Sequence, residues 1–259
     1  MKIARYQLGH SVRIGRLEGD GVRDMGTDLF AHLQVFGQTH TLDQVKLLAP
    51  LVPRKIVGIG NNYFEHAREM GHEPPAQPDI FLKPGTAVIG PDDAIEIPAV
   101  SQQVELEAEL AVIVGRTLRD ATVEEAAIAV LGYTCINDVT ARDLQRSDRT
   151  WARGKGHDTF APLGPFIATN LDPGNLLIES YVNGVRKQYA RTRQMLQNVP
   201  QLLSYISSIM TLEPGDVVAT GTPAGVARIQ PGDVVEVVIE GIGSLRNPVV
   251  ARGASPDIA

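Results

Sequence analysis

Three glutamates, Glu105, Glu107 and Glu109, stand at alternate positions where an apolar run begins. Residues 110–114 are apolar and mostly β-branched, which predicts a buried strand. Side chains two apart on a strand share a face, so these carboxylates would gather at the entrance to a hydrophobic interior. Carboxylates this close repel one another unless a positive charge lies among them. Two or three oxygen ligands suit a hard cation such as Mg2+, and the alternative is a solvated acidic edge.

A further carboxylate, Asp138, ends a second predicted strand at 132–138 and leads into a predicted helix start. If the two strands are neighbours, Glu107, Glu109 and Asp138 converge at one place. Cys135 lies within the second strand, and alternation does not place it with Asp138. We interpret it as a core thiol, because nothing nearby in the sequence would lower its pKa.

Polar residues that could face this acidic group follow along the chain. Arg142 and Gln145 lie one and two turns beyond Asp138, on the same side of the predicted helix. Lys155 is flanked by glycines, which indicates a close approach of the backbone. The spacing is not that of a phosphate-binding loop.

His66 and Glu69 are three residues apart in a predicted helix over 63–70, and therefore on one face. A carboxylate beside an imidazole fixes the ring tautomer and raises its basicity, so this pair could activate a water molecule. The alternative is an ordinary surface pair. Residues 71–78 contain one glycine and three prolines and form a candidate lid. The preceding Gly58-Ile-Gly60 lacks the third glycine of a dinucleotide fingerprint, so we discount a nucleotide site.

Composition bounds the class of protein. The 259 residues are 43% hydrophobic and 21% charged, which predicts one large globular domain with at most a small appendage. A net charge of -6 without a basic run disfavours nucleic acid and membrane surfaces as partners. A single cysteine excludes an intramolecular disulfide and favours the reducing cytoplasm. We find no signal peptide and no apolar run near the roughly 20 residues that span a bilayer.

The chain order predicts an α+β fold that is mostly β. Residues 1–50 form a small β-rich appendage, with strands at 2–6, 11–17 and 21–25, and residues 51–259 form the catalytic domain. Within 117–130 we expect a helix capped by Thr122 with Glu125 in the capping box. A long amphipathic helix is expected within 192–210, broken or kinked by Pro200. Asn183-Gly184 predicts a hairpin turn, and the tail after Arg252 is expected to fray.

Four ordered motifs together resemble the fumarylacetoacetate hydrolase family over roughly residues 53–250. They are EAELAVIVG at 107–115, NDVTARDLQ at 137–145, KGHDTFAPLGP at 155–165 and PGDVVATGTP at 214–223. The resemblance implies a mixed β-roll with few helices, usually assembled as a homodimer. The N-terminal appendage is similar to that of short bacterial members.

The resemblance also implies roles for single residues. Glu107, Glu109 and Asp138 match the three ligands of Mg2+ or Mn2+, whereas Glu105 matches no ligand and is expected to face solvent beside them. His66 and Glu69 match a water-activating pair on the lid. The residues expected around the substrate and its developing charge are Lys155, Arg142, Gln145, Gly221, Thr222 and, as a further candidate, Lys83.

Such a site would hold a 2-oxo acid by its carboxylate and oxo oxygens, and the metal would act as a Lewis acid on the enolate. We therefore predict a metal-dependent hydrolase that cleaves a C–C bond of an acylpyruvate-type 1,3-diketo acid, in aromatic-compound catabolism. The alternatives are a 2-hydroxyhepta-2,4-diene-1,7-dioate isomerase, an oxaloacetate-type decarboxylase, or a sensor that binds the metal and an organic acid without turnover. We expect the lid and the region of Gln188 to form the pocket for the distal group of the substrate.

Overall fold

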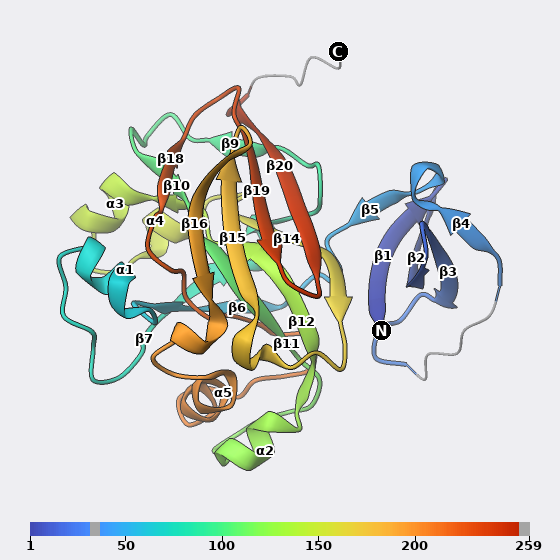
Figure 1. The fold of residues 1–259 in the computed structure, drawn as a ribbon, viewed down its shortest axis with the longest axis horizontal. Helices are drawn as coiled ribbons and strands as arrows, with labels where there is room; N and C mark the ends of the chain where they lie inside the picture. The colour runs from blue at the N-terminus through green and yellow to red at the C-terminus, as the bar shows by residue number, and fades with distance from the viewer. Residues whose placement is uncertain (32–36, 254–259) are drawn as a thin grey trace.

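Strands dominate the structure, a computed structural model that describes residues 1–31 and 37–253. They form sheets of twelve, five and three strands, with both parallel and antiparallel pairs (Figure 1). The helices are few and short. These features confirm the predicted α+β fold with mixed sheets. The tail after Arg252 was expected to fray, and its residues 254–259 lie outside the described residues.

The twelve-stranded sheet forms the spine of the molecule. Its main path runs through β4 (Thr39–Thr41), β3 (Gly21–Gly26), β2 (Ser11–Glu18), β1 (Lys2–Leu8), β14 (Ala161–Ala168), β12 (Val130–Asn137), β11 (Ala108–Val114), β17 (Val217–Ala219), β6 (Lys55–Gly60) and β7 (Asp79–Pro84). Off this path, β5 (Lys46–Leu48) pairs with β1 and β8 (Val88–Ile89) pairs with β14.

Two smaller sheets complete the strands. The five-stranded sheet has the order β16 (Val185–Arg191), β15 (Leu177–Val182), β19 (Val234–Ile239), β20 (Gly243–Ala251) and β9 (Ile95–Ile97). The three-stranded sheet has the order β13 (Thr140–Ala141), β10 (Val104–Leu106) and β18 (Ala227–Ile229). The predicted Asn183-Gly184 turn joins β15 to β16, and both residues adopt positive φ, as a tight hairpin requires.

Strand β11 is buried on both faces, which explains its nearly unbroken apolar sequence. Leu110 and Val112 pack into one hydrophobic cluster, whereas Ala111 and Ile113 pack into another on the opposite face. The neighbouring strand β12 runs antiparallel, with Leu110 opposite Cys135. Cys135 is a buried free thiol whose pKa is raised by burial, as its interpretation as a core residue requires.

The first five strands lie to one side of the remaining elements (Figure 1). The expected strands at 2–6, 11–17 and 21–25 are present as β1, β2 and β3. Tyr6 is buried between these strands and donates a hydrogen bond to Asp24, which also pairs with Arg13. This part is not detached, because Lys2 and Ile3 of β1 pair with Ala168 and Ile167 of β14. The division of the chain at residue 50 stays a prediction.

The α-helices are α1 (Phe64–Glu69), α2 (Val123–Ala127), α3 (Arg142–Ser147), α4 (Ala152–Lys155) and α5 (Val199–Ser207). Single 3-10 turns are η1 (Leu42–Gln44), η2 (Gly85–Ala87), η3 (Pro173–Asn175) and η4 (Thr192–Gln194). Within residues 1–31 and 37–253, none of the helices has both the length and the apolar character needed to cross a bilayer.

Two helix predictions differ from the structure. The capping box of Thr122 and Glu125 is present, but the helix it caps is only five residues long. The amphipathic helix expected within 192–210 is present but shorter than expected, because α5 covers only Val199–Ser207, and Pro200 lies in its first turn. Proline fits there, since the first turn has no partner for its missing N–H. Pro200 therefore starts the helix instead of kinking it.

Candidate active site

The acidic stretch is broken at Glu107, where β10 ends and β11 begins in another sheet. The backbone at the break is tied to the end of β12: Glu107 donates its N–H to the side chain of Asn137 (3.0 Å), and its carbonyl accepts from the N–H of Asp138 (2.9 Å). These bonds bring Asp138 beside Glu107. The two predicted strands are therefore neighbours.

The carboxylates of Glu107, Glu109 and Asp138 converge. Each offers an oxygen, and these oxygens lie within 4.8 Å of one another. All three residues are buried, with exposed fractions of 3%, 1% and 0%. Burial, reinforced by the charges of Asp138 and Glu107, raises the pKa of Glu109 well above its usual value. Burial also opposes ionisation of Glu107, but Lys155 and Arg142 outweigh it and hold the Glu107 pKa below its usual value.

The buried acidic residues around this triad outnumber the buried basic ones. The buried carboxylates in contact here are Glu105, Glu107, Glu109 and Asp138, and the buried cations that pair with them are Lys83, Arg142 and Lys155. With all four carboxylates ionised, one negative charge would be uncompensated in a region shielded from water, where that imbalance is costly, and the raised pKa of Glu109 reflects that cost. A hard divalent cation such as Mg2+ or Mn2+ would favour the ionised form of Glu109, and an all-oxygen donor set fits such a cation.

Glu105 does not face solvent as expected, because it is only 7% exposed and pairs with Arg142. Nε of Arg142 lies 2.7 Å from the Glu105 carboxylate, and Gln103 donates to the other oxygen of that carboxylate. Arg142 is the first residue of α3, and its side chain covers the Glu105 carboxylate from that side. Arg142 also bonds to Glu107 and to Gln145, so its guanidinium bridges the two acids.

Two predicted substrate-binding residues lie behind the metal-ligand candidates instead of lining the pocket. Lys83 is 1% exposed and donates to the Asp138 carboxylate (2.6 Å) and to the carbonyl of Val139 (3.1 Å). Burial lowers the Lys83 pKa, and the charge of Asp138 opposes that effect. The backbone N–H of Gly221 donates to Glu109 (2.8 Å). Both groups therefore orient carboxylates of the triad.

His66 and Glu69 form the expected pair on α1. Nδ1 of His66 lies 3.2 Å from a Glu69 oxygen, and His66 is only 5% exposed. Glu69 also accepts from the backbone N–H of Gly225 (3.0 Å). Partial burial favours a higher Glu69 pKa, but the hydrogen bonds from His66 and Gly225 outweigh it and leave that pKa lowered. Glu69 is thus a carboxylate that holds the His66 ring and fastens α1 to the loop after Thr222.

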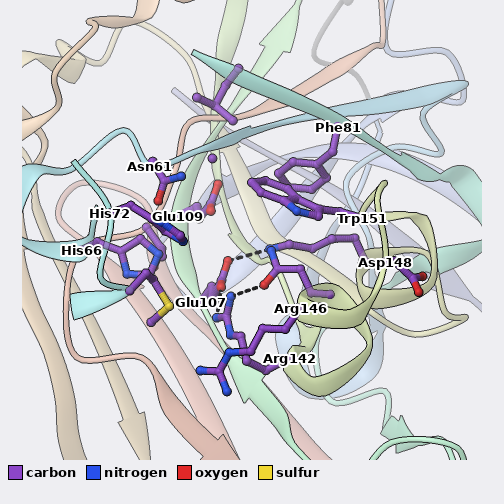
Figure 2. Close-up of a pocket in the computed structure, with 16 residues that line it drawn as sticks. Asn61, His66, His72, Phe81, Glu107, Glu109, Arg142, Arg146, Asp148 and Trp151 are labelled. Carbon is purple, nitrogen blue, oxygen red and sulfur yellow. Dashed lines mark hydrogen bonds and ion pairs between the residues drawn. The ribbon is translucent and has the colours of Figure 1, made fainter. Parts of the chain in front are cut away.

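A pocket of about 360 Å³ brings these groups together. Figure 2 shows Glu107, Glu109 and Arg142 in it, with His66 and His72 on one side and Phe81 and Trp151 on the other. Of the predicted site residues, those that line it are His66, Glu107, Glu109, Arg142, Gln145, Lys155 and Thr222. Asp138, Glu69, Lys83 and Gly221 support these from behind. Gln188, expected at the pocket, is fully buried away from it.

An aromatic wall of the pocket was missed by the sequence reasoning. Phe81 and Trp151 lie against each other with ring centroids 5.4 Å apart, and Nζ of Lys155 lies 4.7 Å from the centre of the Phe81 ring. Glycines make room for both rings. A Cβ at Gly58 would lie 2.1 Å from Phe81, and one at Gly60 would lie 2.7 Å from Trp151. Two glycines two apart on a strand were the available signal, because they indicate a close approach by other groups.

Other lining residues had no signal in the sequence. They are Ile59, Asn61, Met70, Arg146 and Asp148, whereas His72 lies in the segment 71–78 that was predicted as a lid. Most come from short loops or from the exposed side of α3, whose positions depend on tertiary packing.

Comparison with known proteins assigns the two parts of the chain to different family descriptions. The sequence model described as fumarylacetoacetate (FAA) hydrolase C-terminal matches residues 55–250. A second one, described as Rv2993c-like, N-terminal, matches residues 1–50.

Relatives span nearly the whole chain. Protein Rv2993c of Mycobacterium tuberculosis is 45% identical, over 98% of this chain and 99% of its own length. A 2,4-didehydro-3-deoxy-L-rhamnonate hydrolase of Sphingomonas is 42% identical, over 96% of each chain. The crystal structure of a 2-hydroxyhepta-2,4-diene-1,7-dioate isomerase from Mycobacterium marinum is 43% identical, with a TM-score of 0.91, over 98% of this chain and 100% of its own.

Proposed function

The chain belongs to the fumarylacetoacetate hydrolase family, and on that basis we propose that it is a divalent-metal-dependent hydrolase of acylpyruvate-type 1,3-diketo acids. It would cleave the C–C bond between the distal carbonyl and the pyruvate part of the substrate. The observation that carries the proposal is that His66, held by Glu69, lines the same pocket as Glu107 and Glu109 of the acidic triad.

The acidic triad and the basic residues beside it would bind the oxo-acid end of the substrate. Glu107, Glu109 and Asp138 would hold Mg2+ or Mn2+, which supplies Lewis-acid stabilisation of negative charge on the oxo-acid end. Arg142 and Lys155 each bond to Glu107 and also line the pocket, so their remaining N–H donors are available to a substrate anion. These two residues would balance the charge that develops as the C–C bond breaks.

His66 would generate the nucleophile at the other end. Because Glu69 accepts a hydrogen bond from Nδ1, the proton stays on that nitrogen and Nε2 is left as the base. His66 then removes a proton from a water that attacks the distal carbonyl. The same proton is returned to the carbon of the departing pyruvate part, so His66 ends the cycle neutral. General-base catalysis of this kind contributes about 10²–10⁴ in rate.

The second candidate is an isomerase, supported by the similarity to the Mycobacterium marinum structure. In that reaction His66 would move a proton between carbons and no water would be activated. A decarboxylase of the oxaloacetate type would need neither role. A sensor that binds a metal and an organic acid is the non-catalytic alternative.

A turnover screen with added Mg2+ or Mn2+ separates these functions. Its substrates are acylpyruvates, oxaloacetate and muconate-type dienoates. We expect His66→Ala to lower kcat for acylpyruvate cleavage by about 10²-fold or more. The matched control is His72→Ala, since His72 shares the pocket but pairs with no carboxylate within residues 1–31 and 37–253. Its kcat should change much less. Equal kcat in wild type and His66→Ala would remove the water-activating role, and tight binding without turnover would indicate the sensor.

We further propose that the protein acts in the cytoplasm as a homodimer, in the breakdown of aromatic compounds. The family resemblance and the single cysteine support this. Sedimentation velocity at micromolar concentration tests the assembly, and a species of one chain's mass would contradict it.

A further inference from the structure

Gln188 on β16 is fully buried, and its amide makes every hydrogen bond that it can. Its oxygen accepts from the backbone N–H of Ala108 (3.0 Å) and from the hydroxyl of Ser180 (2.9 Å). Its nitrogen donates to the hydroxyl of Thr222 (2.7 Å) and to the carbonyl of Pro223 (2.7 Å). This one side chain therefore joins three segments that are distant in sequence.

The first of these segments carries two of the triad carboxylates. Ala108 lies between Glu107 and Glu109, where the chain passes from one sheet to another. Its N–H is held by Gln188, and its carbonyl accepts a hydrogen bond from the hydroxyl of Thr222 (2.9 Å). Side chains thus fix both backbone polar groups of Ala108. Because the two glutamates leave the backbone on either side of it, the orientation of Ala108 sets how their carboxylates converge.

The second segment is the loop that carries Thr222. The hydroxyl hydrogen of Thr222 is used by Ala108, and one of its lone pairs is used by Gln188. Toward a substrate this hydroxyl can therefore only accept a hydrogen bond. A substrate carboxylate at this wall would have to be met by other donors, such as a backbone N–H.

The same loop reaches the water-activating pair. A Cβ on Gly225 would lie 2.4 Å from the carbonyl of Lys187, so the loop lies directly on the backbone of β16. Gly225 also donates its N–H to Glu69. Strand β16 thus contacts the backbone between the two glutamates through Gln188 and the loop that holds Glu69 through Lys187. Gln188 itself does not reach the pocket.

We propose that Gln188 is a positioning residue that sets the geometry of the metal ligands Glu107 and Glu109 through Ala108 and Thr222. This inference rests on the metal site of the proposed function. Groups that orient metal ligands from outside the ligand set typically contribute 10–100-fold to metal affinity or activity. A residue that only fills the core would change stability and leave the affinity for the metal unaltered.

Mn2+ binding by the full-length protein, followed by the electron paramagnetic resonance of free Mn2+, is the direct test. We expect Gln188→Met to raise the Kd by about tenfold or more. Ser180→Ala is the control, because it removes a hydrogen bond of the same buried amide and leaves the bonds to Ala108 and Thr222 in place. It should bind Mn2+ like wild type. Melting temperatures of both variants separate loss of folding from loss of affinity.

A second pair of variants acts from the other side of Ala108. Thr222→Val removes the hydroxyl and should weaken Mn2+ binding, and Thr222→Ser should restore it. The effect of the double variant Gln188→Met with Thr222→Val on the free energy of Mn2+ binding should differ from the sum of the two single effects, because both changes act through Ala108.

The possible results distinguish failure of the positioning role of Gln188 from failure of the proposed metal site. Wild-type protein that binds no Mn2+ would refute the metal site and the inference with it. Wild-type binding together with an unchanged Kd in folded Gln188→Met would refute only the inference. If Gln188→Met does not fold, the threonine variants decide, and equal affinities for Thr222→Val and Thr222→Ser would overturn the proposal.

Discussion

Replacement of Lys83 by methionine should destabilise the protein strongly, because it leaves the buried carboxylate of Asp138 without one of its cations. The Lys83 side chain is 0% exposed, that of Asp138 is 1% exposed, and the two lie 2.6 Å apart. Removal of one partner of a buried ion pair costs about 3–5 kcal/mol. Asp138 keeps its bond to Lys155, so we expect the lower end, about 3 kcal/mol. With an m-value of about 2–3 kcal/mol/M, the midpoint of urea unfolding would fall by roughly 1–1.5 M.

A second lysine–aspartate pair provides the matched control. Lys46 lies 2.8 Å from Asp93, but these side chains are 58% and 32% exposed. Exposed pairs contribute about 0–1 kcal/mol, so Lys46→Met should move the urea midpoint by less than about 0.5 M. Both variants are measured in EDTA at one pH, so that bound metal does not add stability. Equal shifts of the two midpoints would refute the reasoning, since the pairs differ mainly in burial.

Three further predictions test the site and the first strands. Glu109→Ala should weaken Mn2+ or Mg2+ binding measured by titration calorimetry, and undiminished affinity would count against the triad. The pKa of Asp24 is lowered mainly by its hydrogen bond from Arg13, so its stabilisation is complete above the ordinary pKa of 3.8 and is lost as pH falls through the lower folded-state pKa. The difference in unfolding free energy between wild type and Asp24→Asn should shrink correspondingly in acid, and a constant difference would contradict this. Gly60→Ala should displace Trp151, the only tryptophan of the chain, and shift its fluorescence; an unaltered spectrum would show that the wall can absorb a methyl group.

The convergence of Glu107, Glu109 and Asp138 could be predicted because it depends on local patterns. Each carboxylate stands at the end of an apolar run, and neighbouring antiparallel strands bring such ends together. Glu105 shows where that reasoning stops. It was expected to face solvent beside the other two, but it is buried and shares the guanidinium of Arg142 with Glu107. A break between sheets depends on distant partners, and the sequence near it gives no sign of them.

The expected roles of Lys83 and Gln188 show the same limit. Both were expected to face the pocket, and both are buried behind it. A single sequence can indicate that a polar side chain is near a site. Its hydrogen-bond partners depend on how strands of different sheets pack together, which the sequence does not show. The length of the helix expected within 192–210 was overestimated for a local reason, since the apolar period extends further than the segment that is helical.

The pairing of β1 with β14 has a consequence for shortened forms of the chain. Ile3 and Ile167 are both fully or almost fully buried where these strands meet. Deletion of the first fifty residues would uncover an apolar strand rim with free backbone amides, a surface that invites self-association. The N-terminal strands thus extend the sheet that contains β11 and protect its β14 edge, and truncation should lower solubility before it lowers catalysis.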